Sequence, residues 1–286
     1  MTLLLDEIAR ATARLAEAGV ASPRADAEEL AASIHGVTRG ALHTLPDSAF
    51  DARYWEGIAR REAGEPLQHI TGRAYFRYLE LMVGPGVFVP RPETEVMAGW
   101  AIDVLRDMDV ADPVVVDLGT GSSAIALSIA QEVPQARVHA VELDPGAHEW
   151  ASRNIKNLDE RGQVTLHNAD FADALTELNG QVDLVVSNPP YIPMSEWEYV
   201  PRDVRDHDPA RALWGGGDDG LDAMRIVEAT ARRLLRPGGV IAVEHSDLQG
   251  APVYWIFSEE NGWRDQRNRR DLTDRDRFVT ARLTTE

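Results

Sequence analysis

The most specific chemistry in this chain belongs to a four-residue segment, Asn188-Pro189-Pro190-Tyr191, which directly follows an apolar run. Proline fixes φ and lacks an N–H, so two consecutive prolines give a rigid turn that presents its carbonyl oxygens. The Asn188 side-chain oxygen and the Pro189 carbonyl can together accept both hydrogens of one NH₂ group, and Tyr191 can pack over a planar amide or base. The segment therefore predicts a site that orients the nitrogen of an amide or an aromatic amine. For an Asn-Pro pair alone, a turn that only ends the strand would be the better interpretation.

A second candidate site is a glycine turn between an apolar run and a predicted helix. Its pattern, Gly119-x-Gly121-x-x-Ala124, lets the backbone turn tightly and face a ligand with helix N–H groups. Glu142, at the end of the next predicted strand, is placed to accept hydrogen bonds from ribose hydroxyls. The pattern indicates a nucleoside-containing cofactor, but by itself it does not separate NAD from S-adenosylmethionine. A turn that merely connects strand to helix is the alternative.

Two acidic positions favour S-adenosylmethionine over NAD. Asp117 precedes the glycines and suits a carboxylate facing the ammonium group of the methionine part, a cation that NAD lacks there. Asp170 and Phe171 follow the third predicted strand and can offer a carboxylate to the adenine amine and an aromatic face to its ring. An N-cap and a core aromatic are equally good interpretations of these two residues. With a methyl group held on a sulfonium, the site needs positioning and electrostatics rather than a dedicated base.

The charge of the chain disfavours nucleic acid as a stable partner. There are 47 acidic and 29 basic residues, a formal net charge of −18, and residues 81–257 alone hold 28 acids against 13 bases. A protein that binds DNA or RNA through its phosphates needs the opposite sign. We therefore expect no stable nucleic-acid binding and favour a neutral or basic partner.

Missing residue types exclude several other classes of site. The chain has no cysteine, which excludes disulfides, thiolate metal sites and cysteine nucleophiles. Its single lysine, Lys156, lies in no P-loop, and its histidines lack ligand spacing, so we expect no metal. The longest uncharged run has 14 residues, short of the ~20 that a membrane span needs. Since the N-terminus also lacks the basic segment of a signal peptide, we expect a cytoplasmic protein without membrane contact.

The elements that must position these residues fall into three regions. Helical spacing of apolar residues predicts three short helices within residues 1–68, the third at about 48–61 with Phe50 buried. Residues 69–92 hold β-branched and aromatic residues around a turn at 84–86, which predicts a β-hairpin linker. Beyond the linker, short apolar strands alternate with helices, which indicates βαβ units and a parallel sheet buried on both faces. The predicted strands are 114–116, 137–141, 164–167, 182–187, 240–244 and 278–283, and the last can pair as a hairpin with 263–269. The predicted helices are about 94–108, 123–132, 145–158, 219–235 and 249–260, and a single long loop precedes the helix at 219–235.

Larger segments of the chain resemble a known family. Asp117–Gly121 together with Asn188–Tyr191 is similar to the S-adenosylmethionine-dependent methyltransferases that modify nitrogen. Over nearly its whole length the chain further resembles the release-factor glutamine methyltransferases, the HemK/PrmC family. The segments that carry this resemblance are Glu65–Gly72, Val89–Glu95, Asp208–Leu213, Gly220–Asp222, Val243–His245 and Arg269–Phe278. The first two are more particular to this family than Asn-Pro-Pro-Tyr.

The resemblance implies a fold and a reaction. The fold is α/β, with a Rossmann-like, seven-stranded, mostly parallel sheet in residues 93–286, a hairpin linker at 69–92 and a helical substrate-recognition domain at 1–68. The reaction transfers a methyl group from S-adenosylmethionine to N5 of the glutamine in the Gly-Gly-Gln motif of class I peptide chain release factors and leaves S-adenosylhomocysteine. We expect a monomer. The matched cofactor residues are Gly119, Thr120, Gly121, Ser122, Ser123, Glu142, Phe171 and Asn188, and the matched substrate residues are Asn188, Pro189, Pro190 and Tyr191.

Two residues depart from the family pattern. Ser123 stands where the family usually has glycine, and we expect it to fit if it adopts helical φ and ψ, although its side chain adds bulk near the methionine end. Phe171 stands where tryptophan or an aliphatic residue can occur, and its stacking on adenine should survive. In the linker, we expect Arg91 and Glu93 to form an ion pair that either contacts the substrate or clamps the domains.

Three other functions stay open at this point. An N6-adenine methyltransferase acting on DNA or RNA would use the same loop to hold the exocyclic amine, but the acidic charge and the lack of an aromatic and basic patch disfavour it. A binding module that keeps the cofactor pocket without turnover is supported only by Ser123. NAD-dependent redox chemistry ranks last, because nothing in the chain resembles its acid–base partner.

Overall fold

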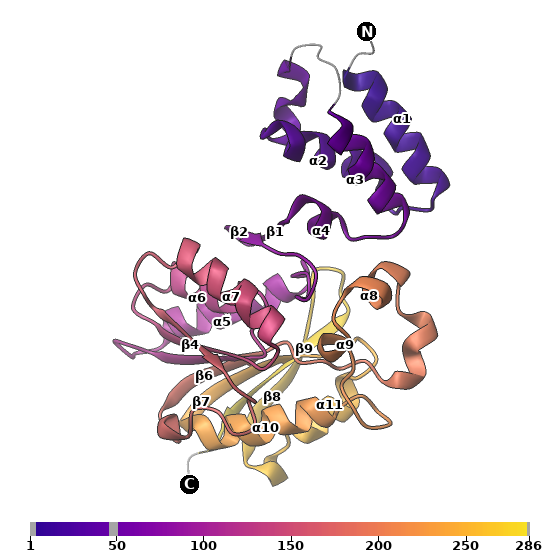
Figure 1. Cartoon of the computed structure of the whole chain (residues 1–286). Coiled ribbons are helices and arrows are strands. Elements are labelled where there is room, and N and C mark those ends of the chain that lie inside the picture. The colour runs from indigo at the N-terminus through magenta and orange to yellow at the C-terminus, as the bar shows by residue number, and fades with distance from the viewer. Residues whose placement is uncertain (1–3, 46–50, 285–286) are drawn as a thin grey trace. The chain divides into compact units, whose positions relative to one another are not determined.

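The computed structural model describes residues 4–45 and 51–284, which form two compact units (Figure 1). One unit comprises Met1–Arg73 with Val200–His207, and the other comprises Ala74–Tyr199 with Asp208–Glu286. Among the described residues, no helix has the length and apolar content needed to cross a bilayer.

The first unit is helical, as the apolar spacing predicted. Leu15, Tyr54 and Ile58 are fully buried at its centre. Gly36 ends the second helix at φ 65°, a left-handed conformation that glycine adopts without strain. The expected start of the third helix near residue 48 and the burial of Phe50 lie outside the described residues. The elements are α1 (Leu4–Glu17), α2 (Pro23–His35), η1 (Arg39–Thr44), α3 (Ala52–Glu62), α4 (Leu67–Thr71) and α8 (Arg202–His207).

A two-stranded hairpin lies in the predicted linker, but its turn is not the predicted one. β1 (Arg73–Phe76) and β2 (Leu79–Met82) are joined by Arg77 and Tyr78, whereas the glycines at 84–86 follow β2. Arg77 adopts a φ of 51° and donates two hydrogen bonds to Glu132, at 2.6 and 3.0 Å. This ion pair holds a non-glycine residue in the left-handed conformation that a two-residue hairpin loop requires.

The second unit contains a seven-stranded sheet with the order β5-β4-β3-β6-β7-β9-β8. The first five strands in this order are parallel, and β9 runs antiparallel to both of its neighbours, β7 and β8. This confirms the Rossmann-like, mostly parallel sheet. The strands are β3 (Val114–Leu118), β4 (Arg137–Glu142), β5 (Val164–Asn168), β6 (Val182–Ser187), β7 (Leu235–Glu244), β8 (Trp263–Arg270) and β9 (Asp276–Leu283).

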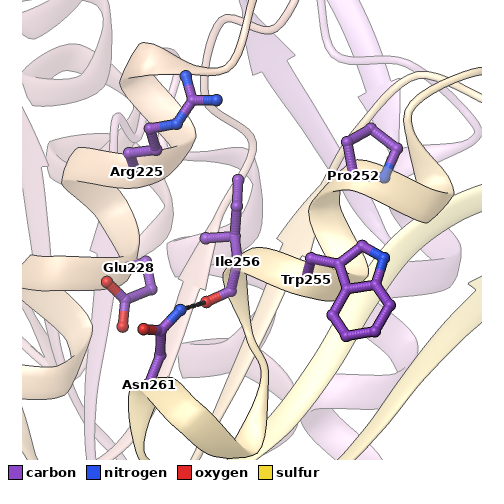
Figure 2. A pocket seen from close by; sticks show the side chains of 6 residues that line it. All are labelled: Arg225, Glu228, Pro252, Trp255, Ile256 and Asn261. Carbon is purple, nitrogen blue, oxygen red and sulfur yellow. Dashed lines mark hydrogen bonds between the residues drawn. The ribbon is translucent and has the colours of Figure 1, made fainter.

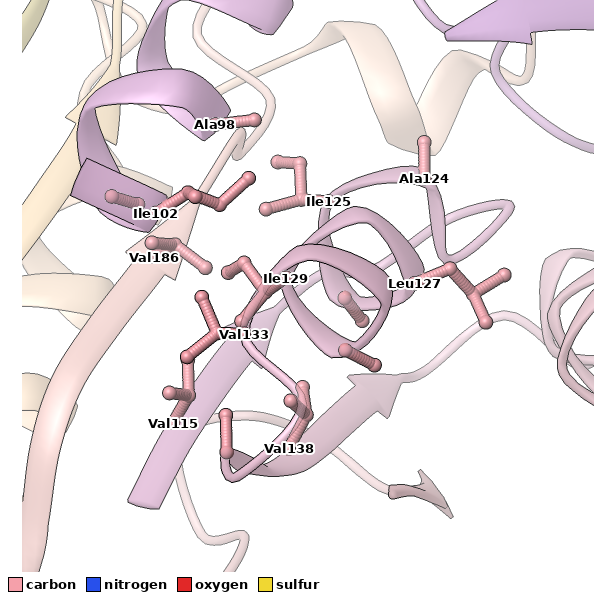
Figure 3. Packing of buried hydrophobic residues seen from close by; sticks show 14 of the residues in the cluster. Ala98, Ile102, Val115, Ala124, Ile125, Leu127, Ile129, Val133, Val138 and Val186 are labelled. Carbon is pink, nitrogen blue, oxygen red and sulfur yellow. The ribbon is translucent and has the colours of Figure 1, made fainter. Parts of the chain in front are cut away.

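Helices cover both faces of the sheet (Figure 1). α5 (Thr94–Asp107), α6 (Ala124–Glu132) and α7 (Pro145–Leu158) pack on one face, and α10 (Asp222–Leu234) and α11 (Gly250–Ile256) pack on the other. Figure 3 shows Ile125 and Ile129 of α6 against Val115 and Val186 of the central strands. Because alternate strand residues point to opposite faces and both faces are covered, the central strands are continuous apolar runs.

The segment between β6 and α10 differs from the single long loop that we expected. It contains three short helical pieces, none of them long enough to give a readable apolar period. These pieces are η3 (Met194–Tyr199), α8 and α9 (Ala210–Leu213), and the remaining short turns of the chain are η2 (Thr176–Leu178) and η4 (Glu259–Asn261).

Candidate active site

Strand register brings the predicted site residues to one edge of the sheet. The residues that follow parallel strands meet at their carboxyl edge, where α/β folds bind ligands. Leu118 pairs with Ser187, and Ser187 pairs with Val243. The Ser187 hydroxyl also donates to the Leu118 carbonyl at 2.7 Å. Three features therefore lie at the carboxyl ends of neighbouring strands. They are the glycine turn, Glu244 and the segment Asn188–Tyr191, which we call the catalytic segment.

The glycine turn after β3 contains three left-handed residues. Gly119, Gly121 and Ser123 have φ values of 73°, 57° and 65°. The N–H groups of Gly119 and Thr120 donate to the Val141 carbonyl at 2.9 and 3.0 Å, which ties the turn to β4. A Cβ placed on Gly119 or Gly121 would meet no heavy atom within 4 Å. Open space therefore lies beside both glycines, as a turn that faces a ligand requires.

Ser123 does not have the helical backbone that we expected. Its φ of 65° and ψ of 26° are left-handed, and its side chain makes no capping hydrogen bond. The residue is buried, with its hydroxyl 3.4 Å from that of Thr120. The left-handed conformation costs an L-residue roughly 1–2 kcal/mol, a cost that glycine avoids. This cost explains why glycine suits the position at which the family usually has it, and it means that the backbone of Ser123 is strained.

Asp117 carries a buried carboxyl group with one orphaned oxygen. Its Oδ2 accepts from the Thr120 hydroxyl at 2.6 Å and from the Ala126 N–H at 3.2 Å. Its Oδ1 is buried and has no hydrogen-bond partner among the residues that the structure describes. Burial raises the pKa of Asp117 to about 7. A cationic group of a ligand would complete this set of contacts.

Glu142, at the end of β4, braces the glycine turn. Its Oε2 accepts from the Gly121 N–H and its Oε1 from the Asp144 N–H, both at 2.8 Å. Burial raises the pKa of Glu142. Since each carboxylate oxygen can accept a further hydrogen bond, the side chain keeps capacity for ribose hydroxyls.

Asp170 and Phe171 both have local structural contacts. Asp170 accepts from the Ala172 N–H at 2.9 Å within a turn, and no helix begins directly after it. Phe171 is half-buried against the apolar cluster that includes α10. The expected contacts of both residues with adenine stay predictions.

The catalytic segment is anchored by hydrogen bonds at several points. Asn188 is half-buried, and its Nδ2 donates to the Thr94 hydroxyl at 3.2 Å. The Tyr191 hydroxyl donates to Oε1 of Glu244 at 3.4 Å, and the Tyr191 carbonyl accepts from Nε2 of Gln249 at 2.7 Å. Burial raises the pKa of the Tyr191 phenol, which keeps it neutral. These contacts hold the turn in one conformation.

Two glycines approach the catalytic segment closely. A Cβ on Gly220, whose φ is 72°, would lie 2.6 Å from the Tyr191 carbonyl oxygen, and one on Gly215 would lie 2.8 Å from the Pro190 carbonyl oxygen. The Gly215 N–H also donates to the Ile192 carbonyl at 3.1 Å. Only glycine allows the backbone to pack this closely.

Arg91 forms a different ion pair from the one that we expected. It donates to Asp208 at 2.6 Å, and its guanidinium carbon lies 5.0 Å from the centroid of the Phe88 ring. Glu93, the expected partner, is the residue just before α5. The Asp208 side chain is fully buried, and a buried carboxylate needs a cationic partner more than an exposed one does.

Sequence reasoning missed three residues that touch the catalytic segment: Thr94, Glu244 and Gln249. Thr94 and Glu244 lie in segments that carried the family resemblance, but neither had an assigned role. The position of Glu244 at the end of a predicted parallel strand was the signal that could have found it. The sequence around Gln249 gives no comparable signal.

A separate hollow lies between α10 and α11 (Figure 2). It has a volume of about 520 Å³ and contains none of the predicted site residues. It is lined by Arg225, Glu228, Pro252, Trp255, Ile256 and Asn261. Within residues 4–45 and 51–284, no group of three or more histidine, aspartate or glutamate side chains is arranged to hold a metal ion.

Comparison with known proteins identifies the family. Residues 7–72 match the family described as the PrmC N-terminal domain, and residues 84–200 match the methyltransferase small domain. The release factor glutamine methyltransferase of Streptomyces coelicolor is 65% identical over 282 residues, which cover 99% of each chain. A Streptomyces pristinaespiralis relative named 4-amino-L-phenylalanine/4-methylamino-L-phenylalanine methyltransferase is 40% identical over 275 residues, which cover 94% of this chain and 91% of the relative.

A solved structure also matches part of the chain. It is the release factor-specific protein-(glutamine-N5) methyltransferase from Alicyclobacillus acidocaldarius, with 30% identity and a TM-score of 0.44. The match covers 72% of this chain and 100% of that one. On the identity and coverage of the Streptomyces coelicolor relative, the chain belongs to the release factor glutamine methyltransferase family, HemK/PrmC.

Proposed function

We propose that this chain methylates the side-chain nitrogen N5 of the glutamine in the Gly-Gly-Gln motif of class I peptide chain release factors, with S-adenosylmethionine as the methyl donor. The observation that carries the proposal is the Asn188 amide. Its nitrogen is engaged by Thr94 at 3.2 Å, so its oxygen is left to accept from a substrate NH₂ group. This orientation suits a primary amide or amine next to a nucleoside-binding turn.

The residues around the glycine turn have the polar groups that S-adenosylmethionine needs. The orphaned Oδ1 of Asp117 would hold the ammonium group, and Glu142 would hold the ribose hydroxyls. The open backbone at Gly119 and Gly121 would face the methionine part. When bound, the cofactor supplies a methyl group on a positively charged sulfur, which takes up the electron pair of the broken bond. The other expected contacts are Thr120, Ser122, Ser123, Asp170 and Phe171.

The catalytic segment would orient the substrate amide. Oδ1 of Asn188 and the carbonyl of Pro189 accept the two amide hydrogens and direct the nitrogen lone pair away from both acceptors. An amide nitrogen is a poor nucleophile, so positioning and electrostatic stabilisation supply most of the rate. The nitrogen gains a carbon bond and loses one proton to water, and the two acceptors stabilise the positive charge that develops before the proton leaves. Pro190 keeps the turn rigid, and Tyr191 packs against the planar amide.

We further propose how the chain divides the work. Residues 1–68 recognise the release factor, 69–92 link the domains and 93–286 carry out methyl transfer in the cytoplasm. The match of residues 7–72 to the PrmC N-terminal domain supports the first assignment. The net charge of −18 supports a protein substrate over stable nucleic-acid binding, and we propose that the enzyme acts as a monomer.

A substrate comparison tests the proposal. The purified protein is incubated with labelled S-adenosylmethionine and one of four substrates: a release factor, its Gln→Ala variant, adenine-containing DNA or RNA, and 4-amino-L-phenylalanine, the amine in the name of the Streptomyces pristinaespiralis relative. We expect one methyl group on the release-factor glutamine and none on the variant. Transfer to nucleic acid alone would replace the proposal with N6-adenine methylation, and transfer to the aromatic amine alone would replace it with a small-molecule reaction.

A further inference from the structure

Gln249 joins the catalytic segment to a second loop. It is the residue just before α11, and it is 6% exposed. Its Nε2 group donates to two backbone carbonyl oxygens, that of Tyr191 at 2.7 Å and that of Asp219 at 3.0 Å. Its Oε1 atom accepts from the Ser246 N–H at 3.2 Å. One buried side chain thus contacts the catalytic segment, the loop before α10 and the loop after β7.

The three partners of Gln249 allow only one orientation of its amide group. The NH₂ end of a glutamine side chain has two hydrogens to donate, and the oxygen end only accepts. Two carbonyl oxygens and one N–H match this set, whereas the reversed amide would direct an acceptor at two acceptors. Because these groups are enclosed by protein, a side chain without donors would leave both carbonyls short of a partner. The contacts therefore fix the side chain and the two loops together.

The loop that Gln249 holds, residues 213–220, packs along the end of the catalytic segment, and we call it the strap. The Ile192 N–H donates to the Leu213 carbonyl at 2.9 Å, and the Gly215 N–H donates to the Ile192 carbonyl at 3.1 Å. The close approaches of Gly215 and Gly220 to carbonyls of the catalytic segment also belong to the strap. The strap can restrain the segment on this side only while both of its ends are held, and Gln249 holds its second end through the Asp219 carbonyl.

The two ends of the catalytic segment are fixed in different ways. The sheet fixes the first end, because Ser187 pairs with strands on both sides. The last residue, Tyr191, lies beyond the sheet, and Gln249 binds its carbonyl. We propose that Gln249 is a positioning residue, which holds the segment and the strap together so that the acceptors of Asn188 and Pro189 keep their places. This inference rests on the proposed function, in which those two acceptors hold the substrate amide.

Gln249→Met tests this role through activity, because methionine keeps the length of the side chain and has no hydrogen to donate. Gln163→Met is the matched control: the Gln163 Nε2 donates to three backbone carbonyls just before β4, at 3.4, 2.9 and 3.1 Å, and these lie at the opposite edge of the sheet from the site.

We expect Gln249→Met to lower kcat for release-factor methylation about tenfold, since a substrate that still binds is held in the wrong place. KM for the release factor and the affinity for S-adenosylmethionine should change by less than about twofold, and Gln163→Met should keep kcat within about twofold of the wild type. A role in folding alone would not produce this separation of kcat from KM.

A measurement without substrate keeps this inference separate from the proposed function. Trp214 of the strap lies against Trp197, which follows the catalytic segment, with ring centroids 5.0 Å apart. In protein labelled with fluorotryptophan, the fluorine NMR signals of this pair are assigned from Trp→Phe variants. Both signals should shift or broaden in Gln249→Met and stay unchanged in Gln163→Met, while the signal of Trp150 on α7 should be the same in every sample.

Three results would overturn the positioning role of Gln249. They are unchanged fluorine signals in Gln249→Met, a kcat for that variant equal to the wild type, and equal losses of kcat in Gln249→Met and Gln163→Met. If Gln249→Met does not fold, Gln249→Asn is judged by the same criteria, because its amide is one methylene too short to keep both carbonyl contacts. If the fluorine signals shift but the wild type methylates no release factor, the proposed function fails and the tie between the strap and the catalytic segment stands.

Discussion

Substitution of Ser123 tests the strain in the glycine turn. Serine at φ 65° costs roughly 1–2 kcal/mol. Glycine avoids this cost but loses roughly 0.5–1 kcal/mol more chain entropy on folding. We compare Ser123→Gly with Ser123→Ala. Both variants lose the hydroxyl and its 3.4 Å contact with Thr120, but only Ser123→Ala keeps the Cβ. Ser123→Gly should therefore be more stable than Ser123→Ala by about 1 kcal/mol.

Thermal and urea unfolding of the two variants measure this difference. For a unit of 150–250 residues, about 1 kcal/mol corresponds to about 2–4 °C in Tm. Ser128 is the matched control, since it is buried in the interior of α6 and its hydroxyl donates to the Ala124 carbonyl at 2.8 Å. There the order should reverse, with Ser128→Ala more stable than Ser128→Gly by about 1 kcal/mol. The reasoning is refuted if Ser123→Ala equals or exceeds Ser123→Gly in stability.

Two further predictions concern the catalytic segment and the cofactor. Gly220→Ala places a methyl group 2.6 Å from the Tyr191 carbonyl oxygen, and we expect methyl transfer to fall roughly tenfold or more. Gly180→Ala has a similar φ of 70° but open space around it, so it should keep its activity; an equal loss in both variants would exclude the loop contact as the cause. Burial raises the pKa of Asp117 to about 7, so its charged fraction increases as pH rises through that value. Calorimetry from about pH 6 to pH 8 should therefore show S-adenosylmethionine binding more tightly as pH rises. Asp117→Asn should weaken binding roughly 10–100-fold and remove the pH dependence, and a wild-type affinity that ignores pH would contradict the assignment. The stability of the free protein should depend on pH in the opposite direction. Because the pKa of Asp117 is raised in the folded state, the neutral form of Asp117 contributes to the free energy of unfolding, and this contribution is lost as pH rises through about 7.

The sequence predicted the centre of the sheet better than its edge. β6 has the predicted bounds, 182–187, because a strand buried on both faces is a continuous apolar run. β8 was only a possible partner of the last strand, since most of its residues are exposed or half-buried and polar. The hairpin turn was misplaced because an ion pair with Glu132, distant in the sequence, stabilises Arg77 at positive φ.

The site was predictable as separate loops but not as a set of contacts. Residue types and spacing identified the glycine turn and the catalytic segment. The contact between Thr94 and Asn188 depends on how α5 packs beside β6, and the ion pair of Arg91 depends on a buried Asp208 far along the chain. The conformation of Ser123 also escaped the sequence, because φ is set by the turn that the surrounding backbone forms.

The central claim is that Asn188 orients a release-factor glutamine for methylation. The most direct test is mass spectrometry of a purified release factor after incubation with S-adenosylmethionine and either the wild-type protein or Asn188→Ala. We predict one methyl group on the glutamine of the Gly-Gly-Gln motif with the wild type, and a rate lower by about 10²–10³-fold with Asn188→Ala, at nearly unchanged affinity for S-adenosylmethionine. An unmodified glutamine with the wild type, a methyl group on another residue, or an Asn188→Ala rate equal to that of the wild type would contradict the account.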